Sequence, residues 1–328
     1  MLNYLKQLIK IHSVSGREAK ITEFIKNEIG DKFDECYTDA LGNLICHKKG
    51  EGKKLMFCAH TDEIGFIVTT IDDGGFIHFA PVGGINFTAA AFSEVVFESG
   101  LRGILVPEME AGSDLKAEKF AVDIGAKDKK HAEKFVKVGD TFALAPSYMR
   151  LHGGKICGRP FDDKIACAAL MAAASEADSF KCDTYFVFSA QEEVGIRGSR
   201  TAAFAIAPDY GVALDVTSTG DSYKAKPMAV KLGGGAAIKI KDSSVICDSR
   251  LVEKMASVAS ENSIKYQYEV LTAGGTDTAS MQLAGAGCKA GCISIPTRYI
   301  HSAVETIDVS DAFAAKDLVV ALARTELE

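Results

Sequence analysis

The chain has 328 residues, of which 47% are hydrophobic and 25% charged, a composition typical of an ordinary folded protein with a sizeable core. A formal net charge of −7 argues against a general nucleic-acid surface, which needs clustered lysine and arginine. No apolar run is long enough to span a membrane, and the amino terminus lacks the pattern of a secretory signal. We therefore expect a cytoplasmic protein with neither nucleic-acid nor membrane partners.

Helical and strand patterns alternate over the first 60 residues. The expected elements are helices over 2–11 and 16–29 and strands over 43–47 and 55–59. From about residue 68 to residue 152 the pattern changes to short alternating runs broken by glycines, which is typical of a β-barrel-like segment. The lysine-rich stretch 127–137 within this segment is predicted to be a solvated surface.

After residue 160 the alternation of helix and strand resumes. The predicted helices are 165–177, 198–205, 249–262 and 310–328, and the predicted strands are 184–189, 211–214, 266–270 and 291–295. The simplest account is one discontinuous α/β domain, made of residues 1–67 and 153–328 and interrupted by a β-rich insertion at 68–152.

Nine cysteines are scattered along the chain, and no two form a C-x-x-C pair. Several lie within apolar runs, as around Cys58, Cys167 and Cys292. An odd count without paired spacing predicts reduced, buried thiols rather than a disulfide framework.

A histidine and an aspartate end the strand predicted at 55–59. Open α/β sheets assemble their active sites just past the carboxyl ends of their strands, and a side-chain period of two places His60 and Asp62 on the same side. A metal-binding imidazole usually donates its other N–H to a carboxylate or carbonyl, a role for which Asp62 is well placed. A structural histidine paired with an aspartate explains the pattern equally well.

Two adjacent glutamates, Glu192 and Glu193, follow the strand predicted at 184–189. Neighbours in an extended chain face opposite ways, so one carboxylate can bind a metal while the other remains a general base for a bound water. A Glu-Glu pair taken alone is more often a solvated turn.

Three further positions have simple explanations when taken singly. Asp162-Asp163 precedes a small-residue helix and suits helix capping, Asp215 suits a turn or helix cap, and His301 lies in a polar loop.

Histidines and carboxylates together favour zinc, cobalt or manganese over calcium or magnesium. The positive charge of two divalent cations would exceed the negative charge of three carboxylates. The remaining positive charge would favour ionisation of a shared water to hydroxide. The candidate metal ligands are His60, Asp162, Glu193, Asp215 and His301.

The chain resembles the tetrahedral (TET) aminopeptidases, two-metal peptidases also known as glutamyl aminopeptidases and, in older usage, as endoglucanases. The similarity covers essentially the whole length, with motifs in the same order at 59–66, 122–126, 161–164, 191–198, 214–217 and 298–302. It implies a three-layer α/β/α catalytic domain of the zinc-aminopeptidase type with a β-barrel-like insertion for dimerisation. It also implies a homo-oligomer in which dimers build a hollow dodecamer that admits peptides.

The resemblance also assigns roles to residues. It implies two divalent metals, zinc or cobalt, bridged by Asp162, with His60 and Asp215 on one and Glu193 and His301 on the other. Glu192 becomes the catalytic base, supported by Asp62, and the peptide bond between Asp162 and Asp163 becomes cis. Lys164 departs from the arginine common in relatives, which puts a local salt bridge in doubt.

These patterns predict a metal-dependent aminopeptidase that removes amino-terminal residues from short peptides by a two-metal hydroxide mechanism. The nearest alternative is an N-deacylase or other amidohydrolase on the same dinuclear site. A glycoside hydrolase is disfavoured because the chain has no tryptophan, and a serine hydrolase because it has no G-x-S-x-G elbow. A metal-stabilised protein without catalysis would leave Glu192 unexplained.

The glycine runs 233–235 and 274–275 lack the spacing of a phosphate loop and are expected to bring backbone close to the cleft.

Overall fold

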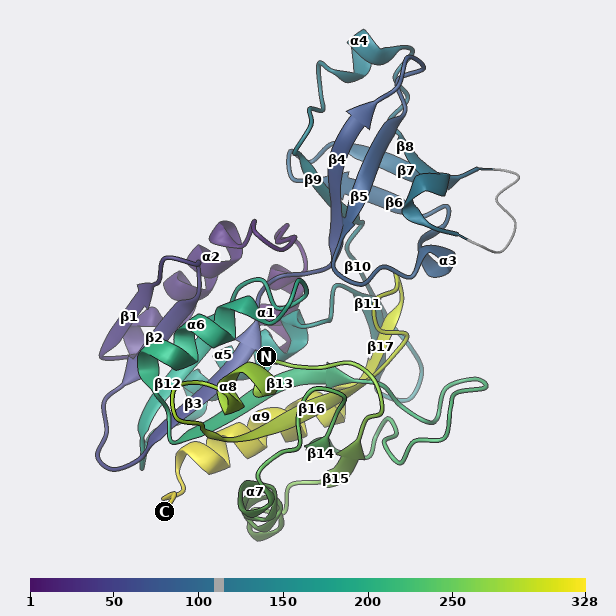
Figure 1. Ribbon diagram of the computed structural model, residues 1–328. Helices are drawn as coiled ribbons and strands as arrows, with labels where there is room; N and C mark the ends of the chain where they lie inside the picture. The colour runs from purple at the N-terminus through teal and green to yellow at the C-terminus, as the bar shows by residue number, and fades with distance from the viewer. Residues whose placement is uncertain (109–114) are drawn as a thin grey trace.

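A computed structural model describes residues 1–108 and 115–328 (Figure 1). Its larger part is built on one mixed sheet whose strand order is β1-β2-β12-β3-β13-β16-β17-β11-β10, with β14 beside β16 and β15 beside β14. The four central strands β12, β3, β13 and β16 run parallel. The strands of this sheet are β1 (Glu35–Thr38), β2 (Leu44–Lys48), β3 (Lys54–His60), β10 (Ser147–Arg150), β11 (Lys155–Arg159), β12 (Asp183–Ser189), β13 (Tyr210–Thr217), β14 (Ala236–Lys241), β15 (Tyr266–Val270), β16 (Lys289–Arg298) and β17 (Glu305–Asp308).

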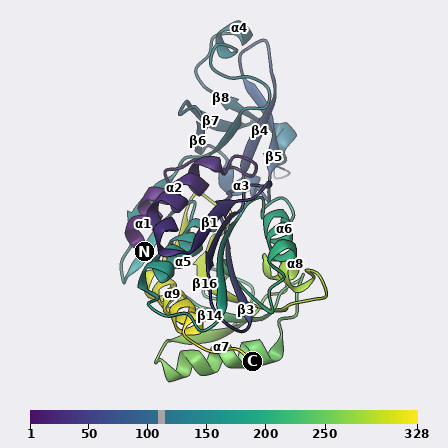
Figure 2. The same ribbon diagram turned by 90° about the vertical axis from the view of Figure 1, so that its left-hand side faces the viewer.

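Helices cover both faces of this sheet, so the larger part has three layers (Figure 2). One face packs against α1 (Leu2–Leu8), α2 (Ala19–Ile29), α5 (Lys164–Glu176), α7 (Ser249–Glu261) and α9 (Val309–Ala323), and the other against α6 (Arg197–Ile206) and α8 (Thr278–Gln282). Side chains along β3 point alternately to the two faces of the sheet. Leu55 and Phe57 belong to the hydrophobic core under the first set of helices, whereas Met56 and Cys58 belong to the core under α6 and α8. Because both faces are covered, the strand is apolar from Leu55 to Ala59.

The second part of the molecule is a closed six-stranded barrel with strand order β4-β5-β8-β7-β6-β9. Its core is rich in phenylalanine, and the rings of Phe66 and Phe142 stack at 4.9 Å between centroids. The barrel strands are β4 (Gly65–Ile71), β5 (Ile77–Val82), β6 (Glu94–Phe97), β7 (Arg102–Pro107), β8 (Phe120–Asp123) and β9 (Thr141–Leu144). The short helices α3 (Phe87–Ala90) and α4 (Lys129–Ala132) and the 3-10 turns η1 (Gly30–Lys32) and η2 (Ala117–Lys119) complete the described elements. The predicted α/β fold with a barrel-like insertion is confirmed.

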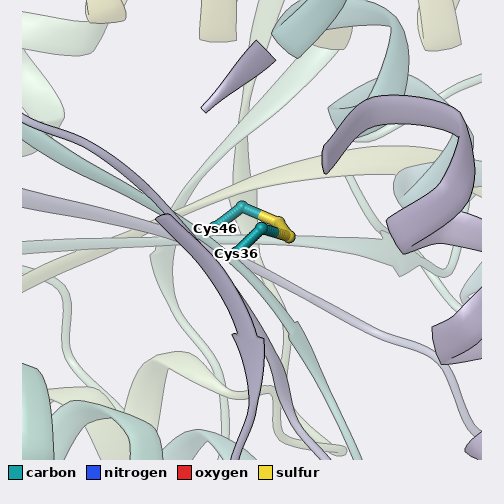
Figure 3. Close-up of a disulfide and its surroundings, with 2 residues drawn as sticks. All are labelled: Cys36 and Cys46. Carbon is teal, nitrogen blue, oxygen red and sulfur yellow. A yellow bond between two sulfur atoms is a disulfide. The ribbon is translucent and has the colours of Figure 1, made fainter. Parts of the chain in front are cut away.

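Two cysteines depart from the prediction that all nine are reduced. Cys36 on β1 and Cys46 on β2 face each other across the antiparallel pair and form a disulfide (Figure 3). Strand β1 had not been predicted, so nothing in the sequence indicated that these two positions would be cross-strand partners. The other seven cysteines are free, and all but Cys288 are buried. No helix in the described ranges combines the length and apolar character that crossing a membrane requires.

Candidate functional site

The predicted site residues meet at one edge of the large sheet. His60 is the last residue of β3, Asp215 lies in the carboxyl-terminal half of β13, and Glu192 and Glu193 follow β12. Because these strands are parallel neighbours, their carboxyl ends lie side by side. Asp162 precedes α5, and His301 follows β16. The sheet thus brings together side chains that are far apart in the sequence.

The five predicted ligands form two groups that share one carboxylate. Oδ1 of Asp162 lies 3.2 Å from Nε2 of His60, while its Oδ2 lies 3.2 Å from Nε2 of His301. Asp215 completes the first group and Glu193 the second, and within each group the potential ligand atoms all lie within 4.8 Å of one another. Such compact clusters of imidazole and carboxylate are suited to transition-metal cations.

Buried charges in these two groups are not fully compensated by protein partners. Burial raises the pKa of Asp215 well above its ordinary value, with a further contribution from Asp162 and only partial relief from His60. Burial opposes protonation of His60, yet hydrogen bonds to Asp162 and Asp62 raise its pKa well above normal. Oε1 of Glu193 is buried and has no hydrogen-bond partner among the described residues. A cluster of this kind fits cations that would satisfy the carboxylates.

Glu192 lies beside both groups but, among the described residues, is a member of neither. It lines the same cleft as His60, Asp162 and Asp215. Burial raises the pKa of Glu192 well above its ordinary value, while His60 counteracts the shift. The two adjacent glutamates are therefore not a solvated turn, since both side chains belong to the cleft.

Asp62 contacts both His60 and the segment that bears the two glutamates. Its carboxylate lies 3.4 Å from Nδ1 of His60, and its backbone carbonyl lies 3.1 Å from the same nitrogen. The carboxylate also accepts hydrogen bonds from the backbone N–H groups of Glu192 and Glu193, at 2.9 and 3.2 Å, and from the Ser15 hydroxyl at 2.6 Å. One buried side chain therefore orients an imidazole and anchors a neighbouring loop.

Glu305 is a comparable anchor that the sequence did not reveal. Its carboxylate accepts hydrogen bonds from the backbone N–H groups of Phe161, Asp162 and His301, at 2.5, 3.1 and 3.1 Å. Burial, reinforced by Asp162, raises the pKa of Glu305 to about 7. Glu305 lies close to His301 in the sequence, but no local signal predicts its contact with the distant segment at Asp162.

We expect Glu305→Gln to loosen the segments that bear Asp162 and His301. The amide would present a donor to at least one backbone N–H group, and each hydrogen bond lost to a buried charged group costs about 1.5–3 kcal/mol. The free energy of unfolding, measured by urea denaturation, should fall by about that amount. Glu326→Gln, at an exposed position, is the control and should leave the unfolding curve unchanged. An unchanged unfolding curve for Glu305→Gln would rule out this anchoring role.

Two expectations concern the residues around Asp162. The peptide bond between Asp162 and Asp163 is cis, as the resemblance implied, and the Asp163 side chain makes no helix-capping hydrogen bond within the described residues.

A salt bridge at Lys164, which the sequence left in doubt, is present. Nζ of Lys164 lies 3.0 Å from Oε1 of Glu63, and both side chains are buried. Lys164 also donates to the backbone carbonyl of Ile11 at 2.7 Å. Lysine at this position therefore forms a buried charge pair with Glu63.

A cleft of about 490 Å³ opens over the two groups. Gly274 and Gly275 line it, as predicted for the second glycine run. The prediction is wrong for the first run, 233–235, which is not part of the cleft lining. There, the N–H groups of Gly233 and Gly235 each donate to the Asp311 carboxylate at 2.7 Å, near the start of α9. A run of glycines in the sequence indicates that another group packs closely against the backbone, but it does not identify that group.

Comparison with known proteins agrees with this arrangement. A protein of Acetivibrio thermocellus is 44% identical over 322 residues, covering 98% of this chain and 97% of the relative. The lysyl aminopeptidase of Pyrococcus furiosus is 32% identical over 338 residues, covering 99% of this chain and 96% of the relative.

Solved structures agree over the same length. An aminopeptidase from the archaeon Desulfurococcus kamchatkensis superposes with a TM-score of 0.93 at 32% identity, covering 98% of this chain and 93% of that chain. The TET1 peptidase of Pyrococcus horikoshii superposes with a TM-score of 0.88 at 34% identity, covering 99% of both chains. The model of the M42 glutamyl aminopeptidase family matches residues 42–318. This chain is therefore a peptidase of the M42 glutamyl aminopeptidase family.

Proposed function

We propose that this protein is a metal-dependent aminopeptidase that removes amino-terminal residues from short peptides at a site holding two divalent cations, zinc or cobalt. The observation that supports this most directly is the shared carboxylate of Asp162, whose two oxygens face different histidines. His60 and Asp215 would complete one site, and Glu193 and His301 the other. Oε1 of Glu193, which has no hydrogen-bond partner among the residues that the structure describes, and the accumulation of buried carboxylates fit such cations.

When bound, two such cations supply Lewis-acid activation of a water and of the scissile carbonyl. The chain itself contributes proton transfer and positioning. Glu192, beside both groups yet outside them, would accept the proton of the attacking water and return it to the leaving amine. Asp62 would hold Glu192 in place through the backbone N–H bond and fix the orientation of the His60 ring.

The insertion predicted at 68–152 is proposed to supply the dimerisation domain. Its barrel strands run from β4 (Gly65–Ile71) to β9 (Thr141–Leu144), whereas β10 (Ser147–Arg150) pairs with β11 in the sheet of the proposed catalytic domain, predicted at 1–67 and 153–328. The TET1 peptidase of Pyrococcus horikoshii can assemble into a tetrahedron or a large octahedral shell. Its similarity over 99% of both chains supports a homo-oligomer here, with a dodecamer as the proposed state. We also propose a cytoplasmic location, because seven of the nine cysteines are free and the Cys36–Cys46 disulfide is the one exception.

The proposal is tested with aminoacyl-p-nitroanilides and unmodified dipeptides, assayed before chelation, after chelation, and after zinc or cobalt is restored. We expect hydrolysis that chelation abolishes and either metal restores. N-acetylated dipeptides should be inert, because an aminopeptidase requires a free amino terminus. Faster cleavage of the acetylated dipeptides would instead identify a deacylase. Hydrolysis that survives complete removal of metal would refute the metal-dependent mechanism.

A further inference from the structure

The cleft over the site divides into a charged floor and uncharged walls. Its ionisable lining residues, within the described part of the chain, are His60, Asp162, Glu192, Glu193, Asp215 and His301. All six are already assigned above to metal binding or proton transfer. The other described lining residues are uncharged, so among them the walls offer no free lysine, arginine, aspartate or glutamate to a substrate side chain.

Branched apolar side chains form much of these walls. Ile196, Leu271 and Ile300 are each half-buried, and Val216 is buried. Apolar side chains left partly exposed around one cleft are available to cover an apolar group of a ligand.

Backbone geometry keeps two of these walls close together. Ile196 has a φ of +55°, a region that a β-branched residue seldom adopts. A Cβ atom on Gly275 would lie 2.8 Å from Oγ of Ser244 and 3.8 Å from Cδ1 of Ile196, and one on Gly274, whose φ is +80°, would lie 3.6 Å from Cδ2 of Leu271. The backbone after β15 therefore lies within van der Waals range of both apolar side chains, and Ser244 leaves Gly275 no room for a side chain of its own.

We propose that the cleft selects peptides whose amino-terminal side chain is uncharged and apolar, of the size of leucine or methionine. This inference rests on the function proposed above, because it places that side chain next to the scissile bond. An apolar side chain gains free energy from burial against Ile196, Leu271 and Ile300. An ammonium or carboxylate there would lose its hydration and find no free counter-charge among the described lining residues, whose charged groups are all engaged at the metal sites or in proton transfer.

Two pairs of p-nitroanilides isolate the effect of charge from that of size. Norleucine has the carbon chain of lysine without its ammonium group, and glutamine is nearly the same shape as glutamate. We expect kcat/KM for norleucine to exceed that for lysine at least about tenfold, and glutamine to exceed glutamate in the same way. Equal or faster hydrolysis of the lysine or glutamate substrate would overturn the inference while leaving aminopeptidase function intact.

Binding provides a readout that does not depend on turnover. Free norleucine and free lysine, as product analogues, are titrated into the full-length protein by calorimetry. Tighter binding of norleucine supports the inference, and tighter binding of lysine overturns it. If no nitroanilide is cleaved, the proposed function fails, but this comparison still decides whether the walls prefer an apolar group.

Substitution of a wall residue tests its position. Leu271→Glu should raise the ratio of kcat/KM for lysine over norleucine about tenfold or more, because it supplies the missing counter-charge. Leu271→Gln is the matched control of equal size without charge, and it should leave the lysine substrate disfavoured. If Leu271→Glu leaves the ratio unchanged, Leu271 does not face the amino-terminal side chain and the assignment of this wall is wrong.

Discussion

Replacing Glu192 by glutamine is expected to lower kcat by about 10²–10⁴-fold, the usual contribution of a positioned general base. The amide is close in size to the carboxylate but cannot accept the proton of the attacking water. The contact with Asp62 uses the backbone N–H of Glu192, so it survives the substitution. Fold and metal content should therefore be preserved. Steady-state kinetics on a leucine nitroanilide and elemental analysis of the same sample measure both quantities.

An exposed glutamate provides the control for this experiment. Glu23 lies on the exposed face of α2, and Glu23→Gln should leave kcat and metal content at the level of the unmodified protein. Unchanged turnover in Glu192→Gln would disprove the role of this residue as the base. Loss of metal together with activity would instead make Glu192 a ligand, contrary to its position outside both groups in the described structure.

Replacing Asp162 by asparagine is expected to weaken binding at both metal positions at once. The two oxygens of this carboxylate face different histidines, and an amide offers only one oxygen and no charge. Loss of a residue that merely supports a ligand commonly costs about 10–100-fold in metal affinity, so loss of a shared ligand should cost more at each position. Calorimetric titration of metal-free protein with zinc or cobalt measures the effect, and activity should fall to background.

Single-group variants provide the comparison for Asp162→Asn. Asp215→Asn should weaken the position that includes His60, and Glu193→Gln the position that includes His301, each leaving the other nearly intact. Two metal ions bound to Asp162→Asn as tightly as to the unmodified protein would contradict a shared ligand. A single weakened position in that variant would show that Asp162 serves only one group.

Much of the secondary structure was predictable because its signals are local. Apolar periodicity gave the helices at α2, α5 and α7 and the strands β3, β12 and β13 to within a few residues. The helix expected over 310–328 ends at Ala323, and residues 324–328 form a turn and irregular chain. Strand β14 was missed because it follows directly on a glycine run, and its pairing with β15 and β16 depends on distant partners.

Three contacts of individual residues were not predicted, and the physical reason is the same for all of them. The disulfide between Cys36 and Cys46, the anchoring role of Glu305 and the use of the 233–235 run by Asp311 all depend on contacts between separate elements. None of these contacts has a fixed spacing in the sequence. Residue type and position relative to a strand end therefore did not predict these contacts.

The sequence by itself determined the kinds of side chain that end the central strands, and hence the candidate set of His60, Asp162, Glu193, Asp215 and His301. Ligand chemistry is a property of the side chain, and the position of each beside an apolar strand is a local signal. Only the tertiary structure decided that Asp162 lies between two histidines and that Asp62 and Glu305 hold the loops around it. Those relations depend on strand order and on hydrogen bonds between distant segments, which local sequence patterns do not encode.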